Sequence, residues 1–384
     1  MLKIKVEGKE LATIIQKAVC NMNKKAAMPI LRKVLLIDDG NVLTAYTSDL
    51  EGYLQANTVD YESISSGAVG IDVEDLKVLL KMDNMVTIIE QENNILVQCG
   101  NKNISLIKYD ISDFPEIPEG NFTGVLEFLE SEFAETINTL TIFTSDNENN
   151  KVMQCFHFNI TESRIEALDG RRIGLKQIED NEKLVPYGKI MVHNSMASDL
   201  KKALDKKSDA IVTLACAENY IRVSGKDFTY YQKKIDGEYF RVGSMLSNDF
   251  DISFNVDTEA MLSHMKYYTE NVIARSDRTP IIIKTENEEI VTYGENTRFE
   301  VSDKLEIKEH IGGNITIGFN PYVLVDALKM ADSDSVTIGG NNPKSPFFIT
   351  ANKYSFLVLP VKVTSEIVER MEKCLARVAS KKNR

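Results

Sequence analysis

The chain has 384 residues, a hydrophobic share of 43%, a charged share of 27% and a formal net charge of −12. This length is too great for one hydrophobic core of ordinary size, so two or three domains are expected, and the composition is that of a soluble globular protein. The acidic balance argues against a protein that coats nucleic acid with a broad basic face. If DNA is a partner, positive charge must be concentrated on one surface.

The sequence lacks the signals of a membrane, secreted or metal-binding protein. No apolar run approaches the roughly 18 residues needed to span a bilayer. Residues 1–7 alternate apolar and charged side chains, as a strand does and a signal peptide does not. The five cysteines are widely spaced without a C-x-x-C pair, and the four histidines lack metal-ligand spacing. We therefore expect a cytoplasmic protein that needs no cofactor and no metal.

In chain order, the sequence predicts three copies of one unit. Each copy begins with a helix, over about residues 9–22, 131–143 and 258–272. A second helix then has apolar residues at i, i+3 and i+4, namely Leu76, Leu79 and Leu80, then Leu200, Ala203 and Leu204, then Leu324, Ala327 and Leu328. Equivalent positions are 124 residues apart both times, from 76 to 200 and from 200 to 324. Asp72, Asn194 and Asn320 are the expected N-caps.

Each second helix is followed by a short strand and a hairpin. The strands are Val86–Ile88, Val212–Leu214 and Val336–Ile338, and the hairpins cover residues 95–106, 220–230 and 347–356. The period has the size of a whole domain. We therefore expect an α+β fold of three tandem domains, each with two helices and about eight strands. Their limits are 1–120, 121–248 and 249–363, and residues 364–384 form a C-terminal extension.

Seven short stretches along this repeat resemble one known family. They are Met28–Leu31, Thr47–Glu51, Asp113–Pro115, Ala167–Arg172, Ile235–Gly237, Gly318–Asn320 and Leu359–Val361. In this order, over residues 1–363, the chain resembles the β subunit of bacterial DNA polymerase III, the DNA sliding clamp. The resemblance implies three copies of the DNA-clamp fold and a head-to-tail homodimer that encircles double-stranded DNA. It also implies a processivity factor for the replicative DNA polymerase, and not an enzyme.

The resemblance implies a peptide-binding groove between the second and third domains. The polymerase, the clamp loader and other proteins with a clamp-binding motif would dock there. Its expected residues are Met153, Leu168, Gly170, Arg171, Arg172, Ile173, Phe240, Ser244, Met245, Leu359, Pro360 and Val361. Gly170 would allow close backbone approach, Arg172 would make a polar contact, and Ile173 would form an apolar wall. Such a slot suits a short extended peptide. Residues 238–244 depart from the usual family stretch, so the preferred peptide is expected to be unusual.

Lysines near the helices are the candidate DNA-contacting residues. They would bind phosphates without reading sequence. The candidates are Lys17, Lys24 and Lys25 near the first helix, Lys77 and Lys81 on the second, and Lys201, Lys202, Lys206 and Lys207 on the fourth. The alternative is that these lysines form an ordinary solvated helix face.

The resemblance also places the dimer contacts, at Ile104 and Leu106 on an edge strand with Val272 and Ile273 opposite. Exposed alternating apolar residues on such an edge invite pairing. Charge placed at both Ile273 and Leu106 is expected to dissociate the dimer into folded monomers.

The C-terminal extension, residues 364–384, goes beyond the usual family end. Its apolar residues have helical spacing and its end is basic, with Ile367, Met371, Cys374, Leu375 and Val378 followed by Lys381, Lys382 and Arg384. It is either a frayed or disordered end or a helix that covers or extends the groove.

Two other functions stay open from the sequence. One is an interaction scaffold that uses the same three domains without encircling DNA. The other is an enzyme, such as a hydrolase that uses the carboxylate-rich loops.

Overall fold

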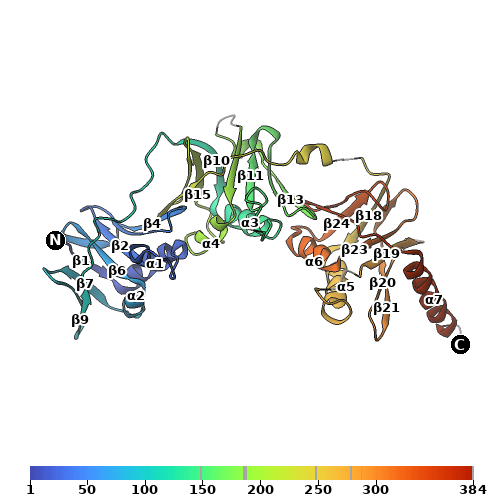
Figure 1. The fold of residues 1–384 in the computed structure, drawn as a ribbon, viewed down its shortest axis with the longest axis horizontal. Coiled ribbons are helices and arrows are strands. Elements are labelled where there is room, and N and C mark those ends of the chain that lie inside the picture. The colour runs from blue at the N-terminus through green and yellow to red at the C-terminus, as the bar shows by residue number, and fades with distance from the viewer. Residues whose placement is uncertain (148, 185–187, 247–248, 277–278, 287, 383–384) are drawn as a thin grey trace. The chain divides into compact units, whose positions relative to one another are not determined.

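The computed structural model describes residues 1–147, 149–184, 188–246, 249–276, 279–286 and 288–382 (Figure 1). It divides into two compact units. Unit 1 comprises Met1–Thr141, Cys155–Glu162 and Ile178–Gly237, and unit 2 comprises Ile142–Gln154, Ser163–Gln177 and Glu238–Arg384.

The same order of elements occurs three times along the chain, as the repeat predicted. A strand and a helix come first, then four or five strands, a second helix and three strands. In the first repeat the elements are β1 (Lys3–Glu7), α1 (Gly8–Ala18), β2 (Lys33–Asp38), β3 (Leu43–Ser48), β4 (Gly52–Thr58), β5 (Tyr61–Ser65), β6 (Gly67–Asp72), α2 (Val73–Leu79), β7 (Met85–Glu90), β8 (Asn94–Cys99) and β9 (Lys102–Ile107).

The second and third repeats follow the same plan. The second contains β10 (Thr123–Leu129), α3 (Glu130–Thr141), β11 (Cys155–Asn159), β12 (Arg164–Leu168), β13 (Arg172–Gln177), β14 (Lys189–His193), α4 (Ser195–Asp199), β15 (Ile211–Cys216), β16 (Tyr220–Ser224) and β17 (Phe228–Lys233). The third contains β18 (Ile252–Asp257), α5 (Thr258–Asn271), β19 (Ile281–Glu286), β20 (Glu289–Glu295), β21 (Glu300–Glu306), β22 (Glu309–Ile311), β23 (Thr316–Phe319), α6 (Pro321–Met330), β24 (Ser335–Gly340), β25 (Phe347–Thr350) and β26 (Tyr354–Val358). A last helix, α7 (Ser365–Lys382), forms the C-terminal extension, and Arg384 of its predicted basic end lies outside the described residues.

Side-chain caps explain where two of the second helices begin. Asp72 accepts the backbone N–H of Glu74 at 3.1 Å, and Asn320 accepts that of Tyr322 at 3.0 Å. Both caps were predicted, because a side-chain oxygen satisfies an unpaired N–H of the first turn. Asn194 was predicted as the third cap, but its backbone is already helical and its side chain makes no capping hydrogen bond.

Helix α4 is short, and it ends before the lysines that were predicted to lie on it. After Asp199 the chain continues in turns, with i+3 hydrogen bonds such as that from the Lys201 N–H to the Ser198 carbonyl oxygen at 3.3 Å. Such bonds belong to the tighter 3₁₀ geometry, which does not continue an α-helix. The placement of Lys201, Lys202, Lys206 and Lys207 on the fourth helix is therefore wrong, and these residues occupy the turns that follow α4.

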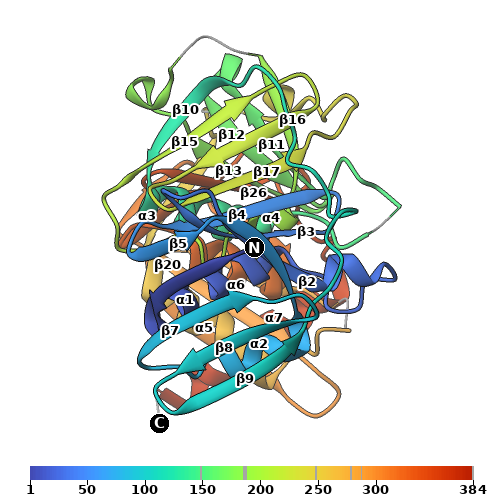
Figure 2. The ribbon, with the colours of Figure 1, turned by 90° about the vertical axis from the view of Figure 1, so that its left-hand side faces the viewer.

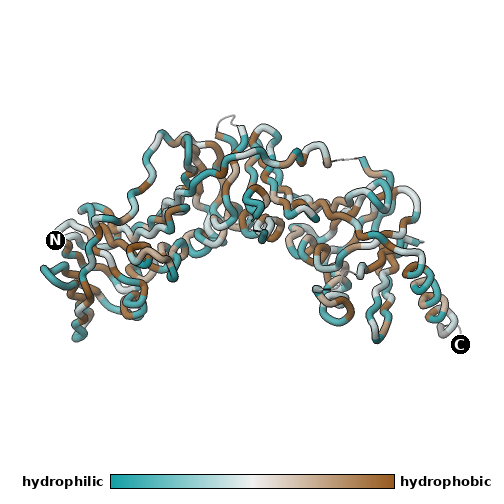
Figure 3. Tube along the Cα trace, in the orientation of Figure 1, coloured by the Kyte–Doolittle hydropathy of each residue, from teal (hydrophilic) through white to brown (hydrophobic). Residues whose placement is uncertain are grey.

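Unit 1 contains two antiparallel sheets. The five-stranded sheet has the order β5-β1-β7-β8-β9, and the eight-stranded sheet has the order β10-β15-β16-β17-β4-β3-β2-β6. Figure 2 shows β7, β8 and β9 side by side. Ile14 and Ile15 of α1 and Leu79 of α2 are buried with apolar residues of both sheets in one core. Hydrophobic and hydrophilic residues are interspersed along the chain (Figure 3), and burial alternates along β1 and β8 of the five-stranded sheet, as expected for a sheet with one buried face.

Unit 2 contains a four-stranded sheet, β21-β20-β19-β23, and a larger sheet in which the strands run β12-β13-β26-β25-β24-β18-β22. Helices α5 and α6 contact each other. The face of the four-stranded sheet that carries Ile282 and Tyr293 packs against α7.

Two sheets are built from strands of different repeats. In unit 1, β4 of the first repeat pairs with β17 of the second. In unit 2, β13 of the second repeat pairs with β26 of the third. Both pairings are antiparallel, and they explain why the two compact units do not coincide with the three repeats. The domain limits remain a prediction, and they lie in the connections after β9, after β17 and after β26.

Candidate functional site

The tight turn between β12 and β13 carries the first of the predicted groove residues. Asp169 shapes it, because its Oδ1 accepts the backbone N–H groups of Arg171 at 2.9 Å and of Arg172 at 3.1 Å. Gly170 has a φ of 84°, a left-handed conformation that glycine adopts without steric cost. A Cβ at Gly170 would lie 3.6 Å from Met153 Cε, which is an ordinary contact. Glycine is therefore favoured at this position by the backbone conformation, and not by a lack of space for a side chain.

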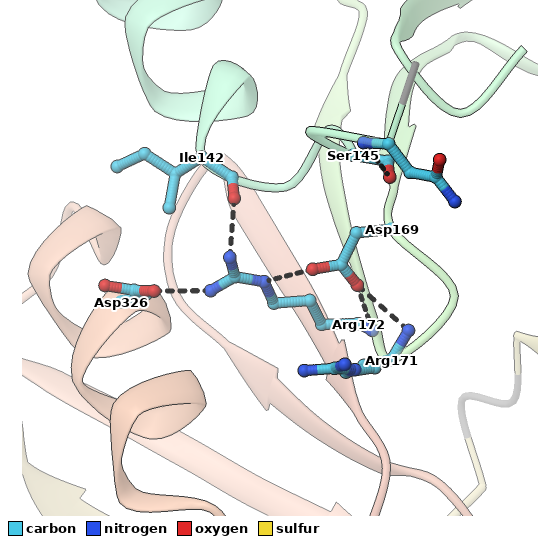
Figure 4. A network of polar contacts seen from close by, with 7 residues as sticks. Ile142, Ser145, Asp169, Arg171, Arg172 and Asp326 are labelled. Carbon is cyan, nitrogen blue, oxygen red and sulfur yellow. Dashed lines mark hydrogen bonds and ion pairs between the residues drawn. The ribbon is translucent and has the colours of Figure 1, made fainter. Parts of the chain in front are cut away.

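Arg172 links this turn to two distant segments (Figure 4). Its Nε donates to Asp169 Oδ2 at 3.0 Å, and its Nη1 donates to Asp326 Oδ2 in α6 at 2.5 Å. Its Nη2 donates to the Ile142 carbonyl oxygen, just after α3, at 2.8 Å. Only 13% of the Arg172 side chain is exposed. The side chain that was predicted to contact a ligand is thus held by three acceptors of its own unit, whereas Arg171 is exposed.

Beneath the turn lies an apolar cluster from three segments of unit 2. Leu168 and Ile173 are buried, and they pack with Val242, Phe348 and Leu357. Met153 is half-buried against the same cluster. The sequence predicted the residues of the turn but missed Val242, Phe348 and Leu357, although the apolar alternation of the last hairpin was visible.

The rim of this cluster carries exposed apolar side chains. Phe240 is 39% exposed, Met245 is 50% exposed and Leu359 is 44% exposed. Ser244 lies in a short 3₁₀ turn, η5 (Val242–Met245), where its hydroxyl donates to the Arg241 carbonyl oxygen at 2.8 Å. The hydroxyl is therefore engaged locally, and the exposed surface of the rim is formed mainly by apolar side chains.

The last predicted segment lies directly beside the turn. The Leu359 N–H donates to the Arg171 carbonyl oxygen at 3.2 Å, and the Val361 N–H donates to the Gly318 carbonyl oxygen at 2.8 Å. Pro360 and Val361 line a cavity of about 790 Å³, together with β23 and the start of α7. This volume is within the range of pockets that bind small molecules or side chains.

Helix α7 packs on the sheet and does not cover the apolar rim. Met371 and Cys374 are buried against Ile282 and Tyr293 of the four-stranded sheet. Of the helix, Ser365, Val368 and Glu369 near its start line the cavity beside Pro360. The expectation that the extension covers the groove is therefore wrong for most of the helix. The start of the helix instead forms part of the wall of the neighbouring cavity.

The lysines predicted to contact DNA all lie in unit 1. Eight of them are exposed, namely Lys24, Lys25, Lys77, Lys81, Lys201, Lys202, Lys206 and Lys207. Helix α1 contacts α2, and the short 3₁₀ turn η1 (Val19–Asn21) contacts α4, so these lysines belong to neighbouring segments. Lys17 differs, because its Nζ lies 2.5 Å from Asp227 Oδ2 and its side chain is largely buried. Its charge is already paired, which makes it a poor ligand for phosphate.

A buried carboxyl group lies close to these turns. Asp199, the last residue of α4, accepts a hydrogen bond from the Tyr230 hydroxyl at 2.7 Å. Burial raises the pKa of Asp199 to about 6, and it outweighs the hydrogen bond from Tyr230, which acts in the opposite direction. This carboxyl group therefore changes its charge within the range of neutral to mildly acidic buffers.

The residues predicted for the dimer contact are less exposed than expected. Leu106, Val272 and Ile273 are buried, and Ile104 packs against the core of the first repeat. The prediction of exposed apolar side chains at these positions is wrong, because successive side chains of a strand point to opposite faces and Ile104 and Leu106 face the core. The other face of β9 carries Asn103, Ser105 and Ile107, and Ile107 is 64% exposed.

Within the described ranges, no group of three His, Cys, Asp or Glu side chains could hold a metal ion. In the same ranges, no helix combines the length and the apolar character needed to cross a membrane.

Comparisons with known proteins agree with this architecture. No family model matches the chain. The beta sliding clamp of Halalkalibacterium halodurans is 22% identical over 355 residues, which cover 88% of this chain and 91% of the relative. The beta sliding clamp of Bacillus subtilis is 20% identical and matched over its whole length, with 94% of this chain covered.

Solved structures match almost the whole chain. A putative DNA polymerase III beta subunit from Eubacterium rectale has a TM-score of 0.87 at 25% identity, and 94% of this chain and 99% of that chain are covered. The DNA polymerase sliding clamp from Bacillus subtilis also has a TM-score of 0.87, at 17% identity, with 94% and 100% covered. Relatives and structures therefore agree along essentially the whole length. Along this length the chain is similar to beta sliding clamps, the beta subunits of DNA polymerase III.

Proposed function

We propose that this chain acts as a DNA sliding clamp. Two copies form a closed ring around double-stranded DNA and tether the replicative polymerase and other proteins with a clamp-binding motif. The chain catalyses no reaction, because the family is one of non-catalytic processivity factors. We also propose that it acts in the cytoplasm and that a clamp loader places it on DNA.

The observation that carries the ring is a pair of edge strands. β9 is an edge of the five-stranded sheet, and β21 is an edge of the four-stranded sheet. β9 is the last strand of its repeat, like β17 and β26, and β21 holds the place of β4 and β13. Inside the chain, β17 pairs with β4 and β26 pairs with β13. The same rule pairs β9 of one copy with β21 of the other, and two such head-to-tail contacts can close a ring.

The register of this contact follows from the turns. The turns before β4, β13 and β21 close with hydrogen bonds to the carbonyl oxygens of Gly52, Arg172 and Phe299, which are therefore equivalent positions. The last hairpin of each repeat can be compared in the same way. Phe228 and Tyr354 accept the hydrogen bonds that close their turns, and Lys102 pairs with Cys99 at the corresponding place, so these three residues are equivalent. Phe228 pairs with Ala56 and Tyr354 pairs with Lys176, in each case four residues after the turn position. Lys102 should then face Asp303 of the second copy, which is four residues after Phe299.

Two independent features support this register. Lys102 and Asp303 have opposite charges and both are exposed, so the pair is favourable. The backbone groups also fit. The bond from the Ile307 N–H to the Glu288 carbonyl oxygen fixes the alternation along β20 and β21, so that Glu300 and Ser302 direct their N–H groups to the open edge. The matching residues of β9, Ser105 and Asn103, do the same by the pairing of β8 with β9.

The exposed lysines of unit 1 supply the proposed DNA contact. They come from segments next to α1, α2 and α4, and phosphate contacts of this kind do not depend on base sequence. A net charge of −12 on the whole chain makes strong adhesion to DNA unfavourable. Weak contacts inside a closed ring would hold the protein on DNA and still let it slide.

The apolar rim of unit 2 is the proposed docking site for partner peptides. Phe240, Met245 and Leu359 are exposed around a buried apolar cluster, and Arg171 adds a positive charge beside them. An extended peptide with apolar anchors and an acidic group fits these features. The cavity beside Pro360 could accept a further side chain of the same peptide.

The ring is tested by measuring the particle mass and by negative-stain electron microscopy of the unmodified chain and of the Ser105→Pro variant. Proline has no N–H, and Ser105 directs its N–H outward, so this change removes a backbone bond of the proposed contact and no backbone bond within the sheet. The side-chain bond from Asn94 Nδ2 to Ser105 Oγ is lost in Ser105→Pro and in Ser105→Val alike. The unmodified chain should give dimers with an open centre, and Ser105→Pro should give folded monomers. Ser105→Val, which keeps the N–H, should remain dimeric. A monomeric unmodified chain would favour the interaction scaffold, and turnover of a substrate would favour an enzyme.

A further inference from the structure

The chain segments that follow the first two repeats share a position. Each lies on the sheet face opposite the helices, where strands of two repeats meet. After the first repeat, the ring of Phe114 lies 5.3 Å from that of Tyr46. Phe114 packs in one cluster with Tyr53 of β4 and with Tyr231 of β17. This connection therefore covers residues on both sides of the β4–β17 pairing.

The connection after the second repeat does the same. Val242 is buried in a cluster with Ile173 of β13 and Leu357 of β26. The ring of Phe250 lies 5.3 Å from that of Phe348 in β25. Ile173 is equivalent to Tyr53, and Leu357 is equivalent to Tyr231, by the turn positions described above. At both junctions within the chain, the segment that follows the repeat thus covers the sheet face opposite the helices.

Helix α7 is the segment that follows the third repeat, and it occupies the equivalent face. Leu35 of β2 pairs with Tyr46 in the first repeat, and Ile282 of β19 pairs with Tyr293 in the third. Tyr46 and Tyr293 both lie six residues before their turn positions, so the two pairs are equivalent. Leu35 and Tyr46 pack under Phe114, whereas Ile282 and Tyr293 pack under Met371 and Cys374 of α7.

The helix crosses the sheet toward the edge strand β21. Lys284 of β19 binds Glu372 at 2.9 Å, and Arg370 binds Glu295 of β20 at 2.6 Å. Farther along the helix, Cys374 Sγ lies 3.8 Å from Ser302 Oγ in β21, and Arg377 forms an ion pair with Glu300.

The helix continues beyond its contacts with β21. It extends from Arg377 to Lys382, which adds about 7.5 Å of helix at 1.5 Å per residue. The next strand of a sheet lies only about 4.8 Å away. Val378, the first residue after Arg377, is 46% exposed.

We propose that α7 bridges two subunits, with its last turns on the β8–β9 face of a second copy of this chain. This inference rests on the ring proposed above. In the register of that ring, Asn103 and Ser105 of the second copy lie beside Ser302 and Glu300, the two residues of β21 that α7 contacts. Ile107 lies on the same face of β9, toward the Glu300 end, and is 64% exposed.

The partner of the exposed end of α7 is a second copy of this chain, because this end lies next to the proposed pairing of β21 with β9 of that copy. Val378 and Ile107 are exposed apolar residues, and the register brings both to the same end of the β9–β21 contact. Leu96 of β8 is also partly exposed and lies next to β9 on that face. The helix would then cover the sheet face at the third junction, as Phe114 and Val242 do at the first and second junctions.

The first test measures the dimer dissociation constant of the full chain by dilution in analytical ultracentrifugation. Val378→Glu and a chain that ends at Arg377 should each weaken the dimer about tenfold, which corresponds to about 1.4 kcal/mol. Both keep every described contact of α7 with its own sheet. Ala376→Glu is the matched control, because residue 376 is exposed and lies about 200° around the helix from Val378. It should leave the dissociation constant unchanged.

The second test is a cross-link between subunits. Val378→Cys protein is mixed with Ile107→Cys protein and mildly oxidised, and a disulfide-linked dimer is expected because the two Cα atoms should come within reach of such a bond. Ala376→Cys mixed with Ile107→Cys should give none. A dimer that keeps its affinity in Val378→Glu and forms no cross-link would overturn the bridging role and leave the ring intact. An unmodified chain that is monomeric at all concentrations would overturn the ring itself.

Discussion

Charge reversal at Asp303 tests the predicted register most directly. If β9 and β21 pair as the two inner junctions do, Asp303 of one copy faces Lys102 of the other. Asp303→Lys then puts like charges opposite each other at both contacts between the two copies. The double variant Lys102→Asp, Asp303→Lys restores opposite charges with the two residues exchanged.

The size of the effect follows from exposure and from the number of junctions. The Asp303 side chain is 61% exposed, so the pair is screened by water and should contribute only about 0.5 kcal/mol. Replacement of this attraction by a repulsion of similar size costs about 1 kcal/mol per junction. A dimer with two junctions loses about 2 kcal/mol, which weakens the dissociation constant about 30-fold.

The assay is the dimer dissociation constant at low ionic strength, and again at 0.5 M salt, where the difference should shrink. Asp303→Lys also removes an intrachain contact with His264 at 3.6 Å, but the double variant lacks it too, so this loss cancels between them. Glu306→Lys is the matched control, because Glu306 is exposed on the same strand but its position lies beyond the end of β9 in this register. An unchanged dimer in Asp303→Lys, or a double variant as weak as the single one, would refute the register.

Two further predictions concern stability and peptide binding. The pKa of Asp199 is raised in the folded state to about 6, so the native state holds the proton more tightly and the stability from this group is lost as pH rises from about 4 to 6. Asp199→Asn should flatten the dependence of unfolding free energy on pH in this range, by about 3 kcal/mol, and an unchanged slope in urea titrations would contradict the assignment. Met245→Glu should weaken binding of a clamp-binding peptide at least tenfold in fluorescence anisotropy, because a charge replaces half-exposed apolar surface. Met28→Glu is a control of equal exposure in unit 1, and equal losses in both variants would exclude the proposed rim.

Much of the fold could be predicted because each repeat carries its own local signals. The apolar spacing of Leu76 and Leu79 was enough to predict α2, and the side chains of Asp72 and Asn320 marked helix starts. These signals act within one or two turns of chain, and both caps form as expected. Asn194 failed as a cap because its side chain does not accept the expected bond, and α4 ended after five residues. A pattern with the right spacing therefore did not fix the length of the helix.

The parts that could not be predicted depend on contacts between distant residues. Arg172 was expected to contact a ligand, but Asp326 in α6 and the carbonyl group of Ile142 hold its guanidinium group. No local pattern links positions 172 and 326. Val272 and Ile273 look like exposed apolar residues after a helix, but both are buried because the end of α5 packs against the rest of unit 2. Tertiary packing decides exposure, and the sequence shows only the residue types.

The proposed ring has three kinds of junction, each present twice, and they differ in one physical respect. A covalent connection joins the repeats at the first and second junctions, so their contacts form within one molecule at high effective concentration. The third junction joins two molecules, and its occupancy depends on protein concentration. In the part of the chain that the structure describes, the edge strands alone offer a short pairing, a weak charge pair and few exposed apolar side chains, such as Ile107. A helix anchored on one subunit by Met371 and Cys374 would add contact area at the one junction that lacks a covalent connection. The stability of the third junction, more than that of either inner one, should therefore set how long the ring stays closed on DNA.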